Sequence, residues 1–387
     1  MTPWDRAGTM AGMIRTAERD RCPGLLRPYR TVDGNMVRLR LPGGFVHADQ
    51  IVAVAKLAAR YANSEIQITS RNNLQVRLPE PVPADFVRDA FATGLMPSPA
   101  HERIRTVVCS PLTSIAPVNA DLSGVVRELD AAIIADPELP NLPGRFLFVF
   151  DDGSDDVLGE AFDLGYRALP GGRGVVFVGG CDEAREIAAA EAVSTLIELA
   201  HRFLAAAEFG DKPAWHVREL ANPAALLEGI GEEIDFQRPA AERPLRYGAH
   251  AGAAVVGVPL GLLTLPQAEA LQRVAADCSK GRIVFTPWRG VVIPGAADRL
   301  EELAAVGLMT CPESVWMTLT ACYGKPCNNA QVDTRAIAEE VATAHPAPFH
   351  HLVHISGCDR VCGEPGGEHV GLIAPANVEA VLTAVGR

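Results

Sequence analysis

Residues 35–79, NMVRLRLPGGFVHADQIVAVAKLAARYANSEIQITSRNNLQVRLP, decide the fold. Apolar residues alternate with polar ones at both ends of this stretch and recur every three or four positions in its middle. This pattern predicts a strand, a turn, an amphipathic helix, a strand, an Asn-Asn turn and a further strand. A helix between strands is typical of a chain that mixes α and β structure.

Residues 253–295, AAVVGVPLGLLTLPQAEALQRVAADCSKGRIVFTPWRGVVIPG, repeat this order of elements. Pro42 and Pro259 are 217 positions apart, and so are Thr69 and Thr286. Helix and strands stay in step at this constant offset. The sequence therefore predicts an internal duplication.

A weaker repeat links RFLFVFDDGSDD (145–156) with FHHLVHISGCDR (349–360), and it places Ser154 where Cys358 stands. Each half is then predicted to hold a small ferredoxin-like unit and a larger α/β unit, in a mixed α/β (α+β) fold. The expected units are 20–85, 86–240, 243–305 and 306–387.

Composition narrows the classes of function. The chain has 387 residues, 48% of them hydrophobic, with a formal net charge of -12. Such a charge repels phosphate backbones and anionic lipids, so we expect no nucleic-acid or membrane partner. The first twenty residues lack the apolar run of a signal peptide, which favours a cytoplasmic protein.

The nine cysteines fall into two groups. One group forms two close pairs in TACYGKPCNNA and HISGCDRVCGEPGG, and the other is scattered among apolar neighbours, where a thiol is usually structural. The paired residues are Cys322, Cys327, Cys358 and Cys362, and the scattered ones are Cys22, Cys109, Cys181, Cys278 and Cys311.

The two pairs suit one metal centre, with a redox pair and a chance arrangement as the alternatives. Zinc sites of this kind usually use C-x2-C hairpins, and both gaps are wider here, which favours a 4Fe-4S cluster. Gly324, Pro326, Gly357 and Gly363 allow the tight turns that aim several sulfurs inward.

Other patterns are less informative. PGGRGVVFVGG (170–180) lacks the glycine order of a dinucleotide site. Segments 120–142 and 182–208 are predicted to be packing helices. His350 and His354 should share one face of a strand about 13 Å apart, at ~3.3 Å per residue, too far to chelate one ion.

The motifs LPGG, TSRNNLQVR, LPGRF and SGC, together with the duplication, resemble the sulfite and nitrite reductase family over roughly residues 20–375. CYGKPC and the ending GCDRVCGEPGGEHVGLIA most resemble a branch of that family in aerobic cobalamin biosynthesis. The known enzyme of that branch uses dioxygen to hydroxylate precorrin-3A at C20 and form a lactone.

The resemblance implies a 4Fe-4S cluster held by the four paired cysteines, and a mononuclear non-haem iron has also been described in this branch. The sequence does not identify ligands for that iron. The reductases commonly space their first pair C-x5-C, whereas Cys322 and Cys327 are separated by four residues. The second pair, Cys358 and Cys362, matches fully.

Reductases of the family bind sulfite or nitrite on sirohaem iron and surround the anion with four cationic side chains. Arg71 and Arg105 match the two family arginines, Arg145 takes the first lysine position, and Leu147 takes the second. Sirohaem and precorrin-3A both carry eight carboxylates. The three arginines are therefore predicted to bind substrate carboxylates.

Further arginines could line the same pocket or form a solvated strand face, and the sequence leaves both readings open. They are Arg38, Arg40, Arg77 and Arg103. Without a flavin or nicotinamide site, electrons should come from an unidentified donor. The alternatives to the dioxygen-dependent enzyme are a sirohaem reductase and a non-catalytic tetrapyrrole carrier.

Overall fold

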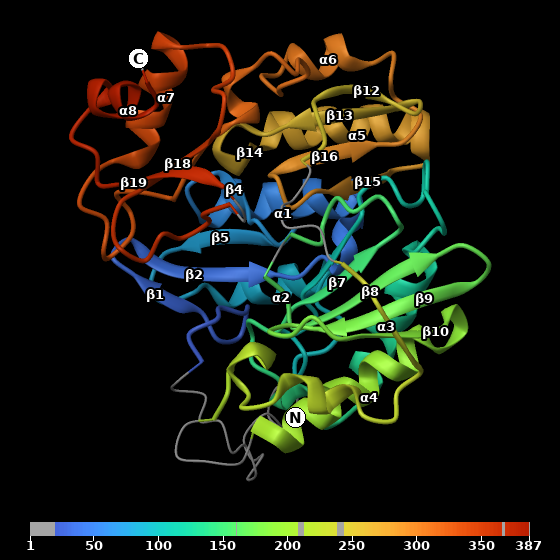
Figure 1. Cartoon of the computed structure of the whole chain (residues 1–387). Coiled ribbons are helices and arrows are strands. Elements are labelled where there is room, and N and C mark those ends of the chain that lie inside the picture. Colours follow the sequence, from blue (N-terminus) through green and yellow to red (C-terminus); the bar gives the residue numbers. More distant parts are fainter. Residues whose placement is uncertain (1–19, 160, 208–212, 238–243, 366–367, 387) are drawn as a thin grey trace.

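The computed structural model describes residues 20–159, 161–207, 213–237, 244–365 and 368–386, and it contains four sheets (Figure 1). Two sheets are antiparallel and come from the duplicated stretches. The first has the order β1-β2-β5-β4-β14 and the second the order β12-β13-β16-β15-β3.

The strands of the first sheet, in that order, are Tyr29–Thr31, Gly34–Leu39, Leu74–Leu78, Glu65–Ile68 and Leu262–Thr264. Those of the second are Gly248–His250, Ala253–Gly257, Gly290–Ile293, Arg282–Phe285 and Phe45–His47. Helix α1 (Ala48–Tyr61) belongs to the first stretch and α5 (Leu265–Ser279) to the second. The predicted duplication is confirmed.

The two halves exchange their edge strands. Strand β3 of the first half pairs with β15 of the second, with Val46 opposite Ile283. Strand β14 of the second half pairs with β4 of the first, with Leu263 opposite Ile66. Both pairings have the same register at the offset of 217. The backbone repeats as well, because Asn72 and Arg289, at matching positions, have φ angles of 59° and 58°.

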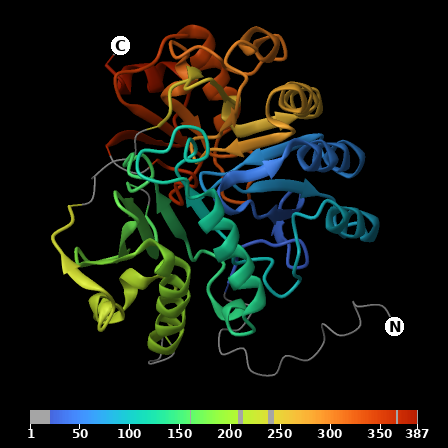
Figure 2. The ribbon, with the colours of Figure 1, turned by 90° about the vertical axis from the view of Figure 1, so that its right-hand side faces the viewer.

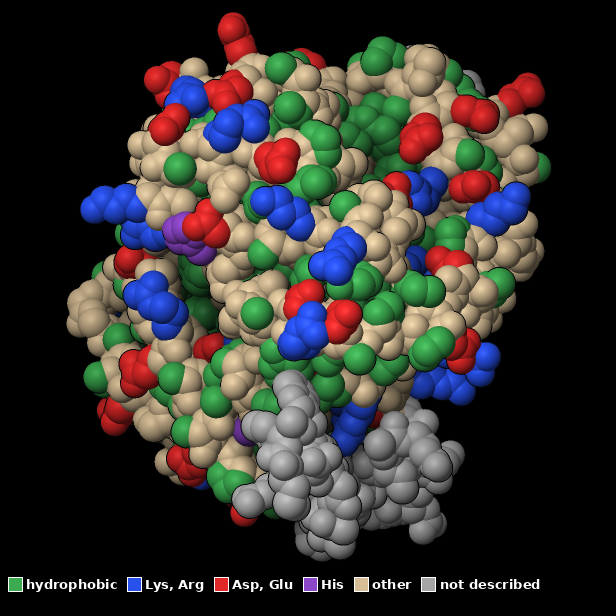
Figure 3. All heavy atoms as spheres, turned by 180° about the vertical axis from the view of Figure 1, so that it is seen from behind, with side chains coloured by type: hydrophobic (Ala, Val, Ile, Leu, Met, Phe, Trp, Pro, Cys, Tyr) green, Lys and Arg blue, Asp and Glu red, His purple; other side chains and the backbone are tan. Residues whose placement is uncertain are grey.

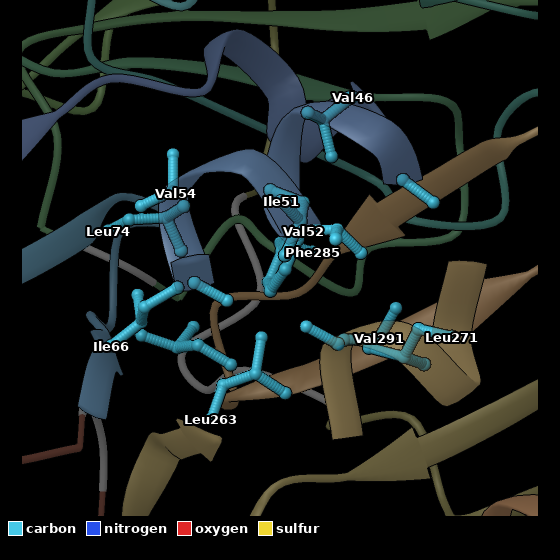
Figure 4. Packing of buried hydrophobic residues seen from close by; sticks show 14 of the residues in the cluster. Val46, Ile51, Val52, Val54, Ile66, Leu74, Leu263, Leu271, Phe285 and Val291 are labelled. Atoms are coloured by element: carbon cyan, nitrogen blue, oxygen red, sulfur yellow. The ribbon is translucent and has the colours of Figure 1, made fainter. Parts of the chain in front are cut away.

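One hydrophobic core joins the halves. Ile51 of α1, Leu271 of α5, and Phe285 and Val291 of the second sheet are fully buried in a single cluster (Figure 4). Figure 2 shows α1 and α5 next to each other on the outer side of the two sheets. Because burial of such side chains stabilises by about 1.5–3 kcal/mol each, neither sheet keeps its core without the other.

The larger units carry parallel strands. A six-stranded sheet has the order β11-β10-β9-β8-β7-β6, and a three-stranded sheet has the order β17-β18-β19. The strands β6 to β11 are Val107–Cys109, Phe148–Asp151, Leu164–Leu169, Arg173–Val178, Ala184–Ala188 and Glu232–Ile234. The strands β17 to β19 are Leu319–Ala321, Leu352–Ser356 and His369–Ile373.

The other α-helices are α2 (Ala84–Ala92), α3 (Ser123–Ala135), α4 (Ala192–Ala207), α6 (Leu300–Ala304), α7 (Thr334–Ala344) and α8 (Val378–Ala384). Short 3-10 helices are Pro42–Gly44, Leu139–Asn141, Ala189–Glu191, Val217–Glu219, Pro223–Leu227, Pro259–Gly261 and Val315–Met317.

The helix expected over 182–208 is only partly correct, because β10 occupies its first part. Ala184 and Ile187 of β10 are buried, and the strand pairs with β9 and β11 on its two sides. Helix α4 begins at Ala192. Sheet pairing with distant strands thus overrides a local composition that suits a helix.

The surface mixes both signs of charge. On the face opposite to the view of Figure 1, Lys and Arg side chains are scattered among Asp and Glu side chains (Figure 3). In the described part of the chain, no helix has the length and apolar character needed to cross a membrane. The first nineteen residues lie outside the described part.

Candidate functional site

The four paired cysteines come together at one end of the three-stranded parallel sheet. Cys322 directly follows β17, and Cys358 lies just beyond β18. Strands β17 and β18 are parallel, so their carboxyl ends meet at the same edge. Cys322, Cys327, Cys358 and Cys362 all line one cavity of about 240 Å³.

Backbone groups hold these loops in tight turns. The amide of Gly357 donates to Cys322 Sγ at 3.2 Å, a contact that also stabilises sulfur in iron–sulfur sites. The amide of Cys327 donates to the carbonyl oxygen of Gly324 at 2.8 Å. Gly324 and Gly363 have φ angles of 78° and 81°, which favour glycine.

The thiols lie close enough to influence one another. Partial burial, followed by the charges of Cys327, Cys322 and Cys358, raises the pKa of Cys362. Like charges that gather in this way need a positive counter-charge to ionise together.

No three Cys, His, Asp or Glu side chains among the described residues converge closely enough for a single metal ion. A cubane cluster binds its thiolates at separate iron atoms, which spreads them further apart than one ion does. The shared cavity, the four thiols and the N–H donor of Gly357 therefore fit a 4Fe-4S cluster.

The first half of the chain supplies the opposite wall of this cavity. Arg38 of β2 and Arg77 of β5 line it, while Arg289 and Arg360 come from the second half. In Figure 1 the strands β18 and β19 lie beside the sheet that carries β2 and β5. The cavity is thus lined by four thiols and four guanidinium side chains, which together make a basic pocket next to the cysteines.

Two of the predicted substrate-binding arginines lie near this wall. Arg71 donates from Nη1 to the carbonyl oxygen of Arg145 at 3.0 Å. Burial, and to a smaller extent the charges of Arg71 and Arg145, lower the pKa of Arg38, while Cys22 acts in the opposite direction. Arg71 therefore contacts the backbone of Arg145, and the charges of both residues influence Arg38.

Arg38 and Arg40 do not form a solvated strand face. Arg40 is only 2% exposed, and Arg38 donates to Gln75 Oε1 at 3.0 Å. Cys22, expected among apolar neighbours, contacts Arg40 Nη2 at 3.3 Å and Arg38 Nη1 at 3.6 Å. These two arginines lower the pKa of Cys22, although burial acts against them.

Arg105 lies elsewhere. Its guanidinium forms two hydrogen bonds with Asp130 of α3, at 2.6 and 2.9 Å. Both residues line a different cavity, of about 330 Å³, next to β3 and β15. Arg105 would have to release Asp130 to bind a substrate carboxylate, so its expected role stays a prediction.

His354 is buried beside the cysteine loops, and its Nδ1 lies 2.8 Å from Thr320 Oγ1. Burial, followed by the charges of Arg289 and His369, lowers the pKa of His354 to about 3, which keeps the ring neutral. His350 does not share the strand with it, because β18 begins only at Leu352. The expectation that both histidines lie on one strand is therefore wrong.

A smaller aromatic cavity of about 60 Å³ adjoins the first. Trp288, Trp316 and Tyr247 line it, and it shares Arg289 and Gly363 with the cysteine cavity. Flat aromatic side chains next to a basic wall suit a ligand with a planar apolar body and charged edges.

The sequence reasoning missed Arg289 and Arg360, and also Tyr323, which lines the cysteine cavity as well. A signal existed for Arg289, because TPWRG (286–290) is the counterpart of TSRNN (69–73) at the offset of 217. Arg71 of TSRNN is a predicted substrate-binding residue, so Arg289 in the repeated motif could have been predicted to bind the same ligand. Nothing comparable pointed to Arg360.

The fold is the internally duplicated nitrite and sulfite reductase fold. The chain matches the nitrite/sulfite reductase ferredoxin-like half domain twice, at residues 27–83 and 250–306. The structure of Mycobacterium tuberculosis NirA protein is similar with a TM-score of 0.69, over 85% of this chain and 69% of that one, at 21% identity.

Two curated relatives represent different members of the family. Precorrin-3B synthase of Sinorhizobium sp. is 28% identical over 97% of this chain and 84% of its own length. Ferredoxin–nitrite reductase of Synechococcus elongatus is 27% identical over 87% of this chain and 76% of its own length. The resemblance to this family, and to precorrin-3B synthase within it, is confirmed.

Proposed function

We propose that the chain is an iron–sulfur oxidoreductase that converts precorrin-3A to precorrin-3B with dioxygen. One observation carries the proposal: four thiols suited to a 4Fe-4S cluster and a group of arginines line the same cavity. Similarity to precorrin-3B synthase over 97% of the chain supports this choice of substrate.

The arginines would hold the substrate by its carboxylates. Arg38, Arg289 and Arg360 line the cavity, and Arg71 and Arg145, which are not part of its lining, lie near Arg38. Guanidinium groups bind carboxylates through two parallel hydrogen bonds, which fixes both position and orientation.

The macrocycle itself would extend toward Trp288 and Trp316, in the aromatic cavity that shares Arg289 with the first. An aromatic wall excludes water from one face of the ring. The arginines and the aromatic side chains would then present a defined edge of the macrocycle to the cluster.

The cluster supplies one-electron transfer when it is bound. In the overall reaction, one atom of dioxygen enters at C20 as the hydroxyl group and the other leaves as water. Two electrons and two protons from an external donor complete the balance. This chain's residues contribute the thiolate ligands, the carboxylate partners and the enclosure of the macrocycle.

A sirohaem-dependent nitrite or sulfite reductase is the second candidate, because ferredoxin–nitrite reductases of several organisms are similar to the chain. Leu147 argues against it. This residue stands where the family has its second anion-binding lysine, and it is 0% exposed in an apolar cluster with Val149 and Phe177. A non-catalytic tetrapyrrole carrier is the third candidate, and it would bind the macrocycle without turnover.

Metal and optical analysis of anaerobically purified protein tests the proposal. We expect iron and acid-labile sulfide in the ratio of a 4Fe-4S cluster and no sirohaem extractable into acidic acetone. Stoichiometric sirohaem together with reduction of nitrite or sulfite would favour the reductase. An intact cluster without any product from precorrin-3A would favour the carrier.

A further inference from the structure

The geometry points to Arg77 and Tyr323 as a clamp by which the first half of the chain positions the cysteine loop of the second half and tunes its cluster. This inference rests on the proposed iron–sulfur site. It concerns positioning residues, since neither side chain is a ligand of the cluster. The clamp is defined as Arg77, Tyr323 and the residues that hold them, which are Asp33, Asn63, Glu65 and Arg335.

Arg77 crosses from β5 to the loop between Cys322 and Cys327. Its guanidinium carbon lies 3.9 Å from the centroid of the Tyr323 ring, and Nη1 donates to the carbonyl oxygen of Pro326 at 3.3 Å. The side chain is only 9% exposed. A guanidinium on an aromatic face is most strongly attracted where water is excluded.

Asp33 fixes the guanidinium from behind. Its Oδ1 accepts a hydrogen bond from Arg77 Nη1 at 2.8 Å. Arg77 Nε is buried and has no hydrogen-bond partner among the described residues. Besides the ion pair with Asp33, the guanidinium contacts the Tyr323 ring and the Pro326 carbonyl oxygen.

Tyr323 follows Cys322 directly and is held on further sides. Its hydroxyl oxygen accepts a hydrogen bond from Asn63 Nδ2 at 3.0 Å. Arg335 of α7 lies 5.2 Å from the ring centroid and forms two hydrogen bonds with Glu65 of β4, at 2.8 and 3.1 Å. Residues of both halves thus enclose one aromatic ring.

These contacts join the first half of the chain to the loop of the second half that carries Cys322 and Cys327. Tyr323 lies between Cys322 and Cys327 in the sequence, so contacts that hold its ring restrain the loop that carries both thiols. Arg77 also places a positive charge on the wall of the same cavity. Charge near a cluster, and hydrogen bonding around it, set its reduction potential.

Three variants separate these contributions. Arg77→Met removes both the charge and the stacking, Arg77→Lys keeps the charge but loses the planar stack, and Tyr323→Leu removes the ring. Arg88→Met serves as the control, because Arg88 is exposed on α2 and its ion pairs within the described residues are with Asp85 and Asp89. Cluster content and midpoint potential are measured on each anaerobically purified protein.

We expect the cluster of Arg77→Met to have a more negative midpoint potential, because reduction then adds negative charge with one cation fewer on the cavity wall. Arg77→Lys should restore the potential but not the lifetime. Tyr323→Leu and both Arg77 variants should lose the cluster in air about fivefold faster, the factor for about 1 kcal/mol of lost cation–π attraction. Arg88→Met should match the wild type in both measurements.

Wild-type potential and lifetime in Arg77→Met, with the cluster present, would overturn the clamp and leave the proposed function intact. Wild-type protein without any cluster would overturn the proposed function and the clamp with it. Equal effects of Arg77→Met and Arg77→Lys on the midpoint potential would also contradict the tuning role. Only Arg77→Met removes the positive charge, so equal shifts would point to a general disturbance of the structure.

Discussion

Ser110 stands in the first half of the chain where Cys322 stands in the second. Each follows the first strand of a parallel unit, and each amide donates to the neighbouring strand, Ser110 to Phe150 at 3.0 Å and Cys322 to Ile355 at 2.9 Å. Ser110 Oγ lies 3.3 Å from Ser154 Oγ, and Ser154 lies in the loop after β7 as Cys358 lies in the loop after β18. The first half therefore fills the matching place with a hydrogen-bonded pair of hydroxyl groups.

A buried carboxyl group completes this first-half cluster and should make stability depend on pH. Ser110 Oγ donates to Asp156 Oδ1 at 2.8 Å. Burial raises the pKa of Asp156 to about 7 from an ordinary value of 3.8. Between these values the folded protein binds a proton that the unfolded chain releases, so the free energy of unfolding should fall as pH rises from about 4 to about 7.

Asp156→Asn should weaken this fall, because the amide oxygen can still accept from Ser110 and no longer ionises. Urea unfolding at pH 5 and pH 7.5 measures the difference. Asp85→Asn, at an exposed position on α2, is the control. An unchanged dependence on pH in Asp156→Asn would contradict the assignment.

Cys358→Ser should remove most of the cluster iron and the broad visible absorption. A cubane held by three thiolates exposes one iron atom to solvent and exchange. Iron and sulfide analysis measures the loss, and Cys181→Ser, at a residue that packs against another core and does not line the cavity, should leave both contents unchanged. Equal iron and sulfide in wild type and Cys358→Ser would show that Cys358 is not a ligand.

Arg71→Leu should weaken binding of precorrin-3A without changing cluster content. A buried carboxylate that loses its guanidinium partner costs about 2–5 kcal/mol. Spectroscopic titration under anaerobic conditions gives the affinity, and Arg173→Leu, exposed on β9, is the control. Unchanged affinity in a folded Arg71→Leu protein would place the substrate elsewhere.

Leu271→Ala should destabilise both halves together. Leu271 is 0% exposed in the core shared by α1 and α5, and such a truncation costs about 2–5 kcal/mol. Unfolding in urea, followed by tryptophan fluorescence and circular dichroism, should shift as one transition, whereas Val32→Ala, 73% exposed, should not shift it. Two separate transitions, only one of them displaced, would contradict a shared core.

Much of the fold follows from patterns that need no distant contact. The strands and helices of residues 35–79 and 253–295 come from local periodicity, and their equal spacing gives the duplication. The grouping of Cys322 with Cys358 follows once both are placed after parallel strands. These features lie within single segments or depend on a repeat that the sequence displays.

Other features depend on contacts that no local pattern encodes. Strands β3 and β14 have three residues each, too few to show an alternation, and they exist because the opposite half offers an edge. Cys22 is expected to have apolar surroundings from its neighbours in sequence, but it contacts Arg38 of β2 and Arg40, which follows that strand. Arg105 matches a family motif, but its guanidinium is bound by Asp130, which lies 25 positions away in the sequence. No pattern around Arg105 indicates this ion pair.

Incubation of the purified, cluster-containing protein with precorrin-3A, an electron donor and ¹⁸O-labelled dioxygen tests the central claim most directly. Mass spectrometry of the product should show one labelled oxygen at C20 of a hydroxylated lactone, with no product formed under anaerobic conditions. A product without label, or six-electron reduction of nitrite or sulfite by protein that contains sirohaem, would contradict the account.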